Sequence, residues 1–292
     1  MIVSPSPVLS FVSPPLSTGA HLATAVPSTR QRLKTQPQQK RGWRWRLRYT
    51  LVLLLAAFMG FVAHYNVDRT FTNEDRHYVH LLLPDLTEGC AVAMSYEAQL
   101  ALIQRIQQAL LTRAPLLSGI EEGTPRELKQ VYLARKGFCY DRSRALEKIF
   151  VYTGFETRHV SVFKREPGVH PVKTVLFHHV RSHAISEVKT KRGWMIVDSN
   201  ATWSGLDADN NPVSMAQLAT RYSGHPNYQP VRWLITVPDD DINFYSEPSI
   251  HVYGLYSRHG RFFPPYTSYI PDYRVRGLLY NFEWTTNEVL SQ

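Results

Sequence analysis

The amino-acid sequence predicts an α+β protein in which helices come first, an antiparallel sheet follows, and one transmembrane helix precedes both. Residues 49–63 form an apolar run without a charge. Residues 95–112 carry apolar side chains at steps of three or four, which is the helical period. After residue 156 the chain alternates polar residues with β-branched or aromatic ones, a pattern that is typical of strands.

The basic charge of the chain belongs to its first 48 residues. The chain has 33 Lys and Arg against 24 Asp and Glu, a formal net charge of +9. Residues 1–48 hold eight of the basic residues and no acidic one, which leaves 25 basic against 24 acidic residues in the remainder. The body has no positive field that would steer it to a polyanion, so we expect no nucleic-acid partner.

The N-terminal region predicts a membrane anchor. Residues 1–48, rich in Ser, Pro, Thr and Gln and then in Arg, are expected to be a disordered basic cytoplasmic tail. Residues 49–65 are expected to be a transmembrane signal anchor, because roughly 17–25 apolar residues span a bilayer. The preceding arginines predict a cytoplasmic N-terminus and an extracytoplasmic domain, which is periplasmic if the source is bacterial. A cleaved signal peptide and a buried helix of the domain are the alternatives.

The next elements are helices. Residues 66–94 are expected to be a juxtamembrane connector, and residues 95–292 one domain with its core at 95–203. The 95–112 helix opens this domain. Thr124-Pro125-Arg126-Glu127 predicts a second helix with Thr124 as its N-cap, because a hydroxyl cap, an early Pro and a Glu three residues on are typical of helix starts. Residues 215–221 favour a further short helix.

A cysteine lies at the predicted start of a third helix. Cys139 precedes an apolar-patterned segment, with Asp141 and Ser143 suited to the first turn and Thr153-Gly154 suited to the stop. A thiol at a helix N-terminus lies in a positive field that favours the thiolate, which is the nucleophilic form. The sequence therefore makes Cys139 a candidate nucleophile.

Two other interpretations of Cys139 stay open. It can be a buried structural cysteine, which is the ordinary role of a lone thiol. It can also form a disulfide with Cys90, since these two are the only cysteines in the chain. Two cysteines are too few for a disulfide framework or a structural zinc site.

Two strands after the cysteine predict a hairpin that pairs a histidine with an aspartate. Strand-like segments at 180–188 and 194–197 flank the polar loop 189–193. A two- or four-residue loop centred here would place His183 directly opposite Asp198, with Cβ atoms roughly 4.5–5.5 Å apart. A carboxylate at that separation would orient the imidazole and stabilise the imidazolium. A nucleophile, a base and an orienting acid would then lie together if the helix start packs beside His183.

These residues resemble a known family. Gly-x-Cys-x-Asp before a helix that ends in Thr-Gly, then Ser182-His183-Ala184 and a Gly193-Trp194-x-x-Val197-Asp198 strand, is similar to the transglutaminase-like superfamily of papain-type cysteine enzymes. The resemblance covers about residues 95–203. It implies a papain-like core, with Cys139 as nucleophile, His183 as general base and acid, and Asp198 as the residue that orients His183.

The resemblance implies thiol-mediated acyl transfer or amide hydrolysis on a protein, peptide or glycan-linked amide, with no cofactor. Two features depart from the family pattern. The family commonly has an aromatic residue after His-Ala, where this chain has Ile185, and the oxyanion residue is open between Gln130 and the backbone N–H groups at Cys139. A catalytically inactive binding or assembly module of an envelope system with the same fold is therefore the alternative.

Three further segments carry weaker signals. His178, His179 and His183 have a metal-like spacing, although only the last two share a strand face. Asp239-Asp240-Asp241 reads as a solvated turn, with calcium binding as its alternative. The aromatic segment 256–266 suits either the wall of a substrate groove for a sugar or anionic polymer, or a packed C-terminal loop.

Overall fold

The computed structural model describes residues 39–164, 168–170, 174, 181–202, 204–222, 232–233, 245, 249–256 and 272–290. The chain divides into two compact units, residues 1–53 and residues 54–292. The helical run α1 (Gln39–Tyr65) is taken by itself, and the folded body comes after it.

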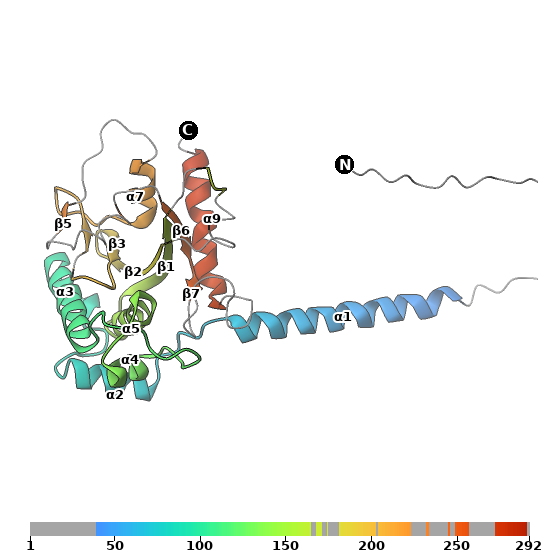
Figure 1. Ribbon diagram of the computed structural model, residues 1–292. Helices are drawn as coiled ribbons and strands as arrows, with labels where there is room; N and C mark the ends of the chain where they lie inside the picture. Colours follow the sequence, from blue (N-terminus) through green and yellow to red (C-terminus); the bar gives the residue numbers. More distant parts are fainter. Residues whose placement is uncertain are drawn as a thin grey trace, which may run out of the picture. The chain divides into compact units, whose positions relative to one another are not determined.

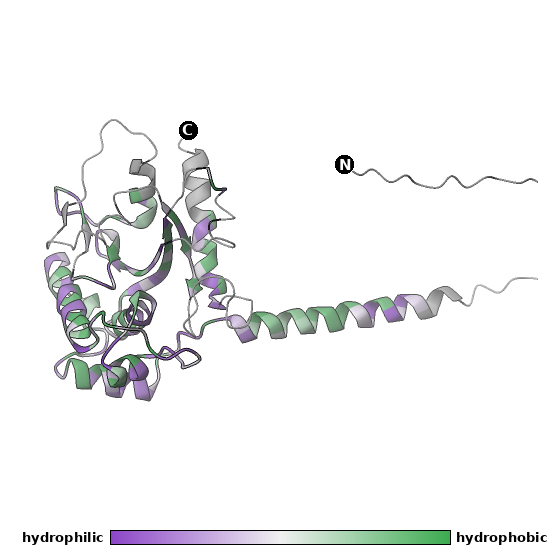
Figure 2. Cartoon of the chain, in the orientation of Figure 1, coloured by the Kyte–Doolittle hydropathy of each residue, from purple (hydrophilic) through white to green (hydrophobic). Residues whose placement is uncertain are grey.

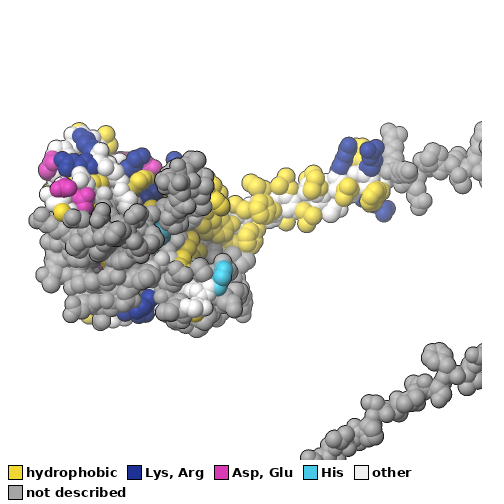
Figure 3. All heavy atoms as spheres, turned by 90° about the horizontal axis from the view of Figure 1, so that it is seen from above, with side chains coloured by type: hydrophobic (Ala, Val, Ile, Leu, Met, Phe, Trp, Pro, Cys, Tyr) yellow, Lys and Arg dark blue, Asp and Glu magenta, His cyan; other side chains and the backbone are white. Residues whose placement is uncertain are grey.

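Helix α1 has the length and composition of a membrane span. Its segment Trp43–Tyr65 is 23 residues long and contains an 18-residue stretch with a mean hydropathy of 1.7, none of which is buried within the chain. The ribbon of this helix is coloured hydrophobic over most of its length in Figure 2, and Figure 3 shows basic side chains gathered toward its N-terminal end. A buried helix of the domain is excluded for α1, because its apolar side chains are exposed.

Between α1 and the sheet, the described chain forms five helical elements, and α5 lies between the sheet and α4 (Figure 1). Helix α3 is capped by Ser95, whose hydroxyl accepts a hydrogen bond from the Ala98 amide at 3.2 Å. Helix α5 ends at Tyr152, and Gly154 then adopts a φ of 93°, as the Thr-Gly stop predicts. The elements are α2 (Asn73–Leu82), the 3₁₀ turn η1 (Cys90–Val92), α3 (Tyr96–Arg113), α4 (Leu128–Ala134) and α5 (Cys139–Tyr152).

Residues 66–94, where a connector is expected, belong to the packed body. Thr72 and Asp75 cap α2 reciprocally, and Val79, Leu83 and Leu86 are buried in the main core. The segment therefore packs as part of the domain, because its apolar side chains find partners on α3, α4 and α5.

The predicted cap of α4 is wrong. This helix begins at Leu128 with Glu127 as its N-cap, so Thr124 lies before it. Two residues between Thr124 and Leu128 have partners elsewhere in the fold: Arg126 is buried against Asp141, and Glu127 forms an ion pair with Lys148 at 2.6 Å. Tertiary ion pairs thus override the local capping signal at this helix start.

The sheet has four strands in the order β3-β2-β1-β6, and the three pairings are antiparallel. Helix α5 packs against β1 and β2, and α9 packs against β6 (Figure 1). Two-stranded ribbons, β4 with β5 and β7 with β8, lie outside it. The bounds are β1 (Glu156–Lys164), β2 (Ser182–Thr190), β3 (Gly193–Val197), β4 (Gly205–Leu206), α7 (Met215–Tyr222), β5 (Arg232–Trp233), β6 (Ser249–Tyr253), β7 (Leu255–Tyr256), β8 (Asp272–Tyr273) and α9 (Val275–Leu290).

The β2–β3 hairpin differs from the predicted register by two residues. Thr190 pairs with Gly193 across a two-residue loop, so Glu187 faces Ile196 and His183 does not directly oppose Asp198. The Thr190 hydroxyl fixes this turn, because it accepts from the Arg192 amide at 3.2 Å and donates to the Gly193 carbonyl at 2.9 Å. A slip of two residues preserves the sheet face of each side chain. His183 and Asp198 therefore still share a face.

Hydrophobic clusters fill both faces of the sheet. The larger cluster joins α2, α3, α4 and α5 to Val188, Met195 and Val197 of the sheet. The second joins Val160 and Ile185 to α7 and to Tyr245. The sheet is thereby fixed between two layers, as an α+β fold requires.

Candidate active site

Cys139 is the first residue of α5. Phe138 occupies the N-cap position, and its backbone N–H donates to the Asp141 carboxylate at 2.8 Å. The Asp141 side chain thus closes the first turn from within, as its position in the sequence predicts. The thiol consequently lies where helix amides have no intrahelical acceptor and where the helix dipole favours negative charge.

A buried ion pair fixes the loop before the cysteine. Asp141 is fully buried and pairs with Arg126, which is 1 % exposed. Burial raises the pKa of Asp141, and this effect outweighs the lowering by Arg126 and by the amides of Phe138 and Ile120. The Arg126 guanidinium also donates to the Ile120 carbonyl at 3.2 Å. These contacts tie residues 120–126 to the start of α5.

His183 and Asp198 meet although they are not directly opposed. The two side chains are buried, and the His183 Nε2 lies 2.6 Å from the Asp198 Oδ2. Asp198 lies just past the end of β3, so its side chain is free of the strand ladder and reaches back to His183.

Three donors besides His183 hold the Asp198 carboxylate. The Tyr245 hydroxyl donates to Oδ2, while the backbone amides of Asn200 and Ala201 donate to Oδ1 at 2.5 and 2.8 Å. Gln107 on α3 donates to the Asp198 backbone carbonyl at 2.9 Å. A carboxylate with this many donors is held ionised and in one orientation.

The electrostatics of the pair favour charge separation. Burial lowers the pKa of His183. The charge of Asp198, the hydrogen bond to Asp198 and a hydrogen bond with the Cys139 side chain outweigh this effect and raise the pKa to about 10. Burial raises the pKa of Asp198, yet His183, Tyr245 and the Asn200 amide lower it on balance. At neutral pH the arrangement is an imidazolium beside a carboxylate.

The thiol and the imidazole share a cavity of about 330 Å³. Nε2 of His183 is engaged by Asp198, so Nδ1 is the ring nitrogen that can exchange a proton with the Cys139 thiol. The three residues singled out from the sequence therefore come together in one place. The cavity is lined by Leu116, Phe138, Cys139, Tyr140, Arg181, Ser182, His183 and Asn200.

The other candidates from the sequence lie away from this cavity or outside the described residues. Gln130 lies on α4 and does not line the cavity. Cys90 and Cys139 are both free thiols, so the disulfide alternative is wrong. In the described part of the chain, no group of three or more His, Cys, Asp or Glu side chains is placed to hold a metal ion. His178, His179, Asp239-Asp240-Asp241 and residues 257–266 lie outside the described residues.

Three residues of the site are not predicted by the sequence patterns. Tyr245 contacts Asp198 from a distant segment that carries no local signal. Gln107 sits among apolar helix positions, where a buried amide could have been noticed. Asn200 bonds the Arg142 guanidinium, and the Asp198-Ser199-Asn200 run is a turn-forming signature that could have indicated it.

Comparison with known proteins agrees with this geometry. The model of the transglutaminase-like superfamily matches residues 90–199, a span that contains Cys139, His183 and Asp198. No curated protein and no solved structure matches the chain. The matched span runs from η1 through the helix of Cys139 to the end of the β2–β3 hairpin. Residues 90–199 of this chain are a transglutaminase-like superfamily domain.

Proposed function

We propose that this chain is a membrane-anchored cysteine enzyme that transfers or hydrolyses an acyl group through Cys139. The observation that carries the proposal is the contact of the His183 imidazole with the Asp198 carboxylate on one side and with the Cys139 thiol on the other. A base held in one tautomer beside a thiol at a helix start is the arrangement that nucleophilic catalysis requires.

The chemistry is set by these positions. The His183 imidazolium holds the proton that the Cys139 thiol has given up, and the thiolate attacks the carbonyl carbon of an amide. The imidazolium then returns the proton to the leaving amine, which leaves a thioester on the sulfur. Water or a second amine resolves the thioester, with His183 as the base. Asp198 stabilises the imidazolium throughout.

The backbone N–H of Cys139 is our candidate for the oxyanion donor. It lies in the first turn of α5, where helix amides have no intrahelical acceptor. Donors at such a position would bind the negative oxygen that develops on the attacked carbonyl. Gln130 is set aside for this role, because it does not line the cavity.

Helix α1 gives the proposed enzyme its location. Its arginine-rich start favours a cytoplasmic N-terminus, which puts the domain outside the cytoplasm. The substrate would then be an envelope or extracytoplasmic protein, peptide or glycan-linked amide. A reporter enzyme that works only in the cytoplasm should be inactive when it is fused after residue 292. Activity of that fusion would contradict this topology.

Thiol alkylation tests the enzyme. In a Cys90→Ser background, Cys139 should react with iodoacetamide at pH 7 faster than a free cysteine peptide, because the imidazolium favours the thiolate. His183→Gln should bring the rate down toward that of the peptide. A Cys139 that reacts no faster than the peptide would contradict the proposal.

Two observations favour a second function. The His183 side chain is only 2 % exposed, so access to its ring is restricted, and the residue after Ala184 is Ile185 in place of the aromatic residue. These features favour a non-catalytic binding or assembly module. A Cys139→Ser chain that fully restores a deletion phenotype would support the module over the enzyme.

A further inference from the structure

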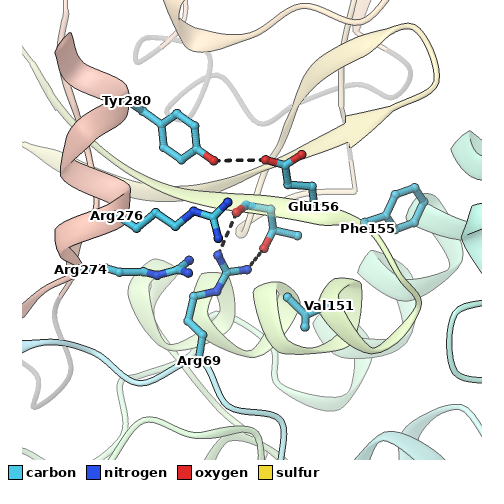
Figure 4. A pocket seen from close by; sticks show the side chains of 8 residues that line it. Arg69, Val151, Phe155, Glu156, Arg274, Arg276 and Tyr280 are labelled. Atoms are coloured by element: carbon cyan, nitrogen blue, oxygen red, sulfur yellow. Dashed lines mark hydrogen bonds between the residues drawn. The ribbon is translucent and has the colours of Figure 1, made fainter. Parts of the chain in front are cut away.

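Three arginines line a cavity that is separate from the one that holds Cys139. Arg69 lies shortly after α1, while Arg274 and Arg276 stand at the start of α9, and all three line a cavity of about 260 Å³. Figure 4 shows their guanidinium groups turned toward one another beside the first residues of β1. The lining residues are Arg69, Val151, Phe155, Glu156, Thr157, Arg274, Arg276 and Tyr280.

Close backbone packing sets the position of Arg274 and Arg276. Gly254, with a φ of 74°, lies against Gly277, where an added Cβ would come within 2.6 Å of the α9 backbone. The Arg274 amide also donates to the Gly254 carbonyl at 2.8 Å. The first turn of α9 is therefore fixed against the β6–β7 turn, and the two guanidinium groups face Arg69 without depending on a loose loop.

The positive charge in the cavity is incompletely balanced. Arg69 is held by Glu147 at 2.9 Å and by the Thr157 carbonyl and hydroxyl, which leaves two of its five N–H groups. Among the described residues, no carboxylate lies within ion-pair distance of Arg274 or Arg276.

The acidic residue that lines the cavity has partners of its own. Glu156 is bonded by Lys189 at 3.0 Å and by the Tyr280 hydroxyl at 3.2 Å. Burial and the charges of Arg69 and Arg276 lower the pKa of Arg274. A bound anion would relieve this repulsion, since Arg groups bind oxyanions through paired N–H donors.

The cavity also lies close to the end of α1 along the chain. Arg69 comes four residues after Tyr65, and four residues span at most about 14 Å. Val67 donates to the Tyr273 carbonyl at 2.8 Å, directly before Arg274. A phosphate at the surface of a bilayer crossed by α1 is therefore within reach of the chain that carries these arginines.

We propose that Arg69, Arg274 and Arg276 form a binding site for a phosphate group, supplied either by an anionic phospholipid headgroup or by a free phosphate. Arg274 and Arg276 clamp the phosphate oxygens, and the remaining N–H groups of Arg69 contribute from the opposite wall. The cavity admits a five-atom oxyanion with several waters, since a water takes roughly 30 Å³ in the liquid.

The test uses the full chain in neutral detergent at constant ionic strength. Inorganic phosphate is titrated in one arm, mixed micelles of phosphatidylglycerol in a second, and phosphatidylcholine micelles in a third. Binding is read from the midpoint of thermal unfolding and from calorimetric titration. The variants are Arg276→Gln, and Arg274→Gln with Arg276→Gln. The matched control is Arg76→Gln with Arg105→Gln, which removes two exposed charges elsewhere and leaves the arginines at the start of α1 unchanged.

We expect the wild type and the control to bind phosphatidylglycerol or phosphate, and the double variant to bind roughly tenfold or more weakly. Binding in both arms identifies a site open to free phosphate, and binding of phosphatidylglycerol alone identifies a lipid headgroup site. Cys139 alkylation reports that each variant is folded. The proposal would be overturned if the wild type bound neither phosphate nor phosphatidylglycerol more tightly than phosphatidylcholine, or if a folded double variant bound them as the control does.

Discussion

Replacing Asp198 with Asn should change the protonation of His183 more than any other single substitution in the site. In the wild type the pKa of His183 is about 10 against an ordinary 6.5, because the carboxylate outweighs the effect of burial. That difference corresponds to about 5 kcal/mol in favour of the imidazolium, at about 1.4 kcal/mol for each pH unit. Without the carboxylate, burial is the main remaining influence, and the pKa of His183 should fall to 6.5 or below.

The protonated share of His183 at pH 7 should therefore fall from nearly all molecules to about a quarter or fewer. The assay is the rate of Cys139 alkylation by iodoacetamide between pH 5 and 9, in a Cys90→Ser background, monitored by intact mass. We expect the rate at pH 7 to drop about tenfold or more, since a neutral imidazole no longer stabilises the thiolate.

The matched control is Asp85→Asn, which removes an exposed carboxylate that pairs with Arg105 on the surface. It should leave the alkylation profile unchanged. A folded Asp198→Asn chain with the wild-type profile would refute the reasoning, because the charge of His183 would then not depend on its buried partner.

Three other substitutions or conditions test the same contacts through the free energy of unfolding of the full chain in detergent. Because the pKa of His183 is raised from 6.5 to about 10, its contribution to the free energy of unfolding should be complete below pH 6.5. As the pH rises to 10, the free energy of unfolding should fall by on the order of 5 kcal/mol, and the His183→Gln chain should not show this fall. Tyr245→Phe should destabilise by about 1–2 kcal/mol, because Asp198 loses a buried donor, whereas Tyr132→Phe on the partly exposed side of α4 should cost little; equal effects would contradict the hydrogen bond. Asp141→Ala should lower the free energy of unfolding by about 3–5 kcal/mol, because Arg126 would be left buried without its partner. Glu74→Ala, which breaks an exposed pair with Lys129, should lower it by less than about 1 kcal/mol.

The order of the elements was predictable from local patterns. Ser95 before a helical apolar repeat, Cys139 before an apolar-patterned segment and Thr153-Gly154 after it each correspond to a boundary in the fold. These signals suffice because caps, stops and periodicity act within a few residues.

The parts that the sequence could not supply depend on contacts between distant segments. The hairpin register is set by the Thr190 hydroxyl and by Gln99 of α3, whose side chain accepts from the Lys191 amide at 2.9 Å. Tyr245 reaches Asp198 across 47 positions of the chain. The prediction that His183 meets Asp198 was right in outcome although its register was wrong, because a two-residue slip keeps both side chains on one face.

Helix α5 shows a further limit of pattern reasoning. Every residue from Asp141 to Phe150 is buried, although five of them are charged. A helix with one apolar stripe is expected to expose its charges. Here they are instead paired with elements on several sides, and no local pattern announces those partners.

Because of this pairing, α5 depends on side-chain contacts with several segments around it. Arg142 donates a hydrogen bond to the Asn200 side chain, and Lys148 forms an ion pair with Asp75. Glu147 forms an ion pair with Arg69 and accepts a hydrogen bond from the Tyr256 hydroxyl. One residue inserted or deleted within the helix would rotate the remaining turns by about 100° and misalign these contacts together. A protein engineer could vary the loops that surround this helix in length, but would have to transplant the helix and its partners as a single block.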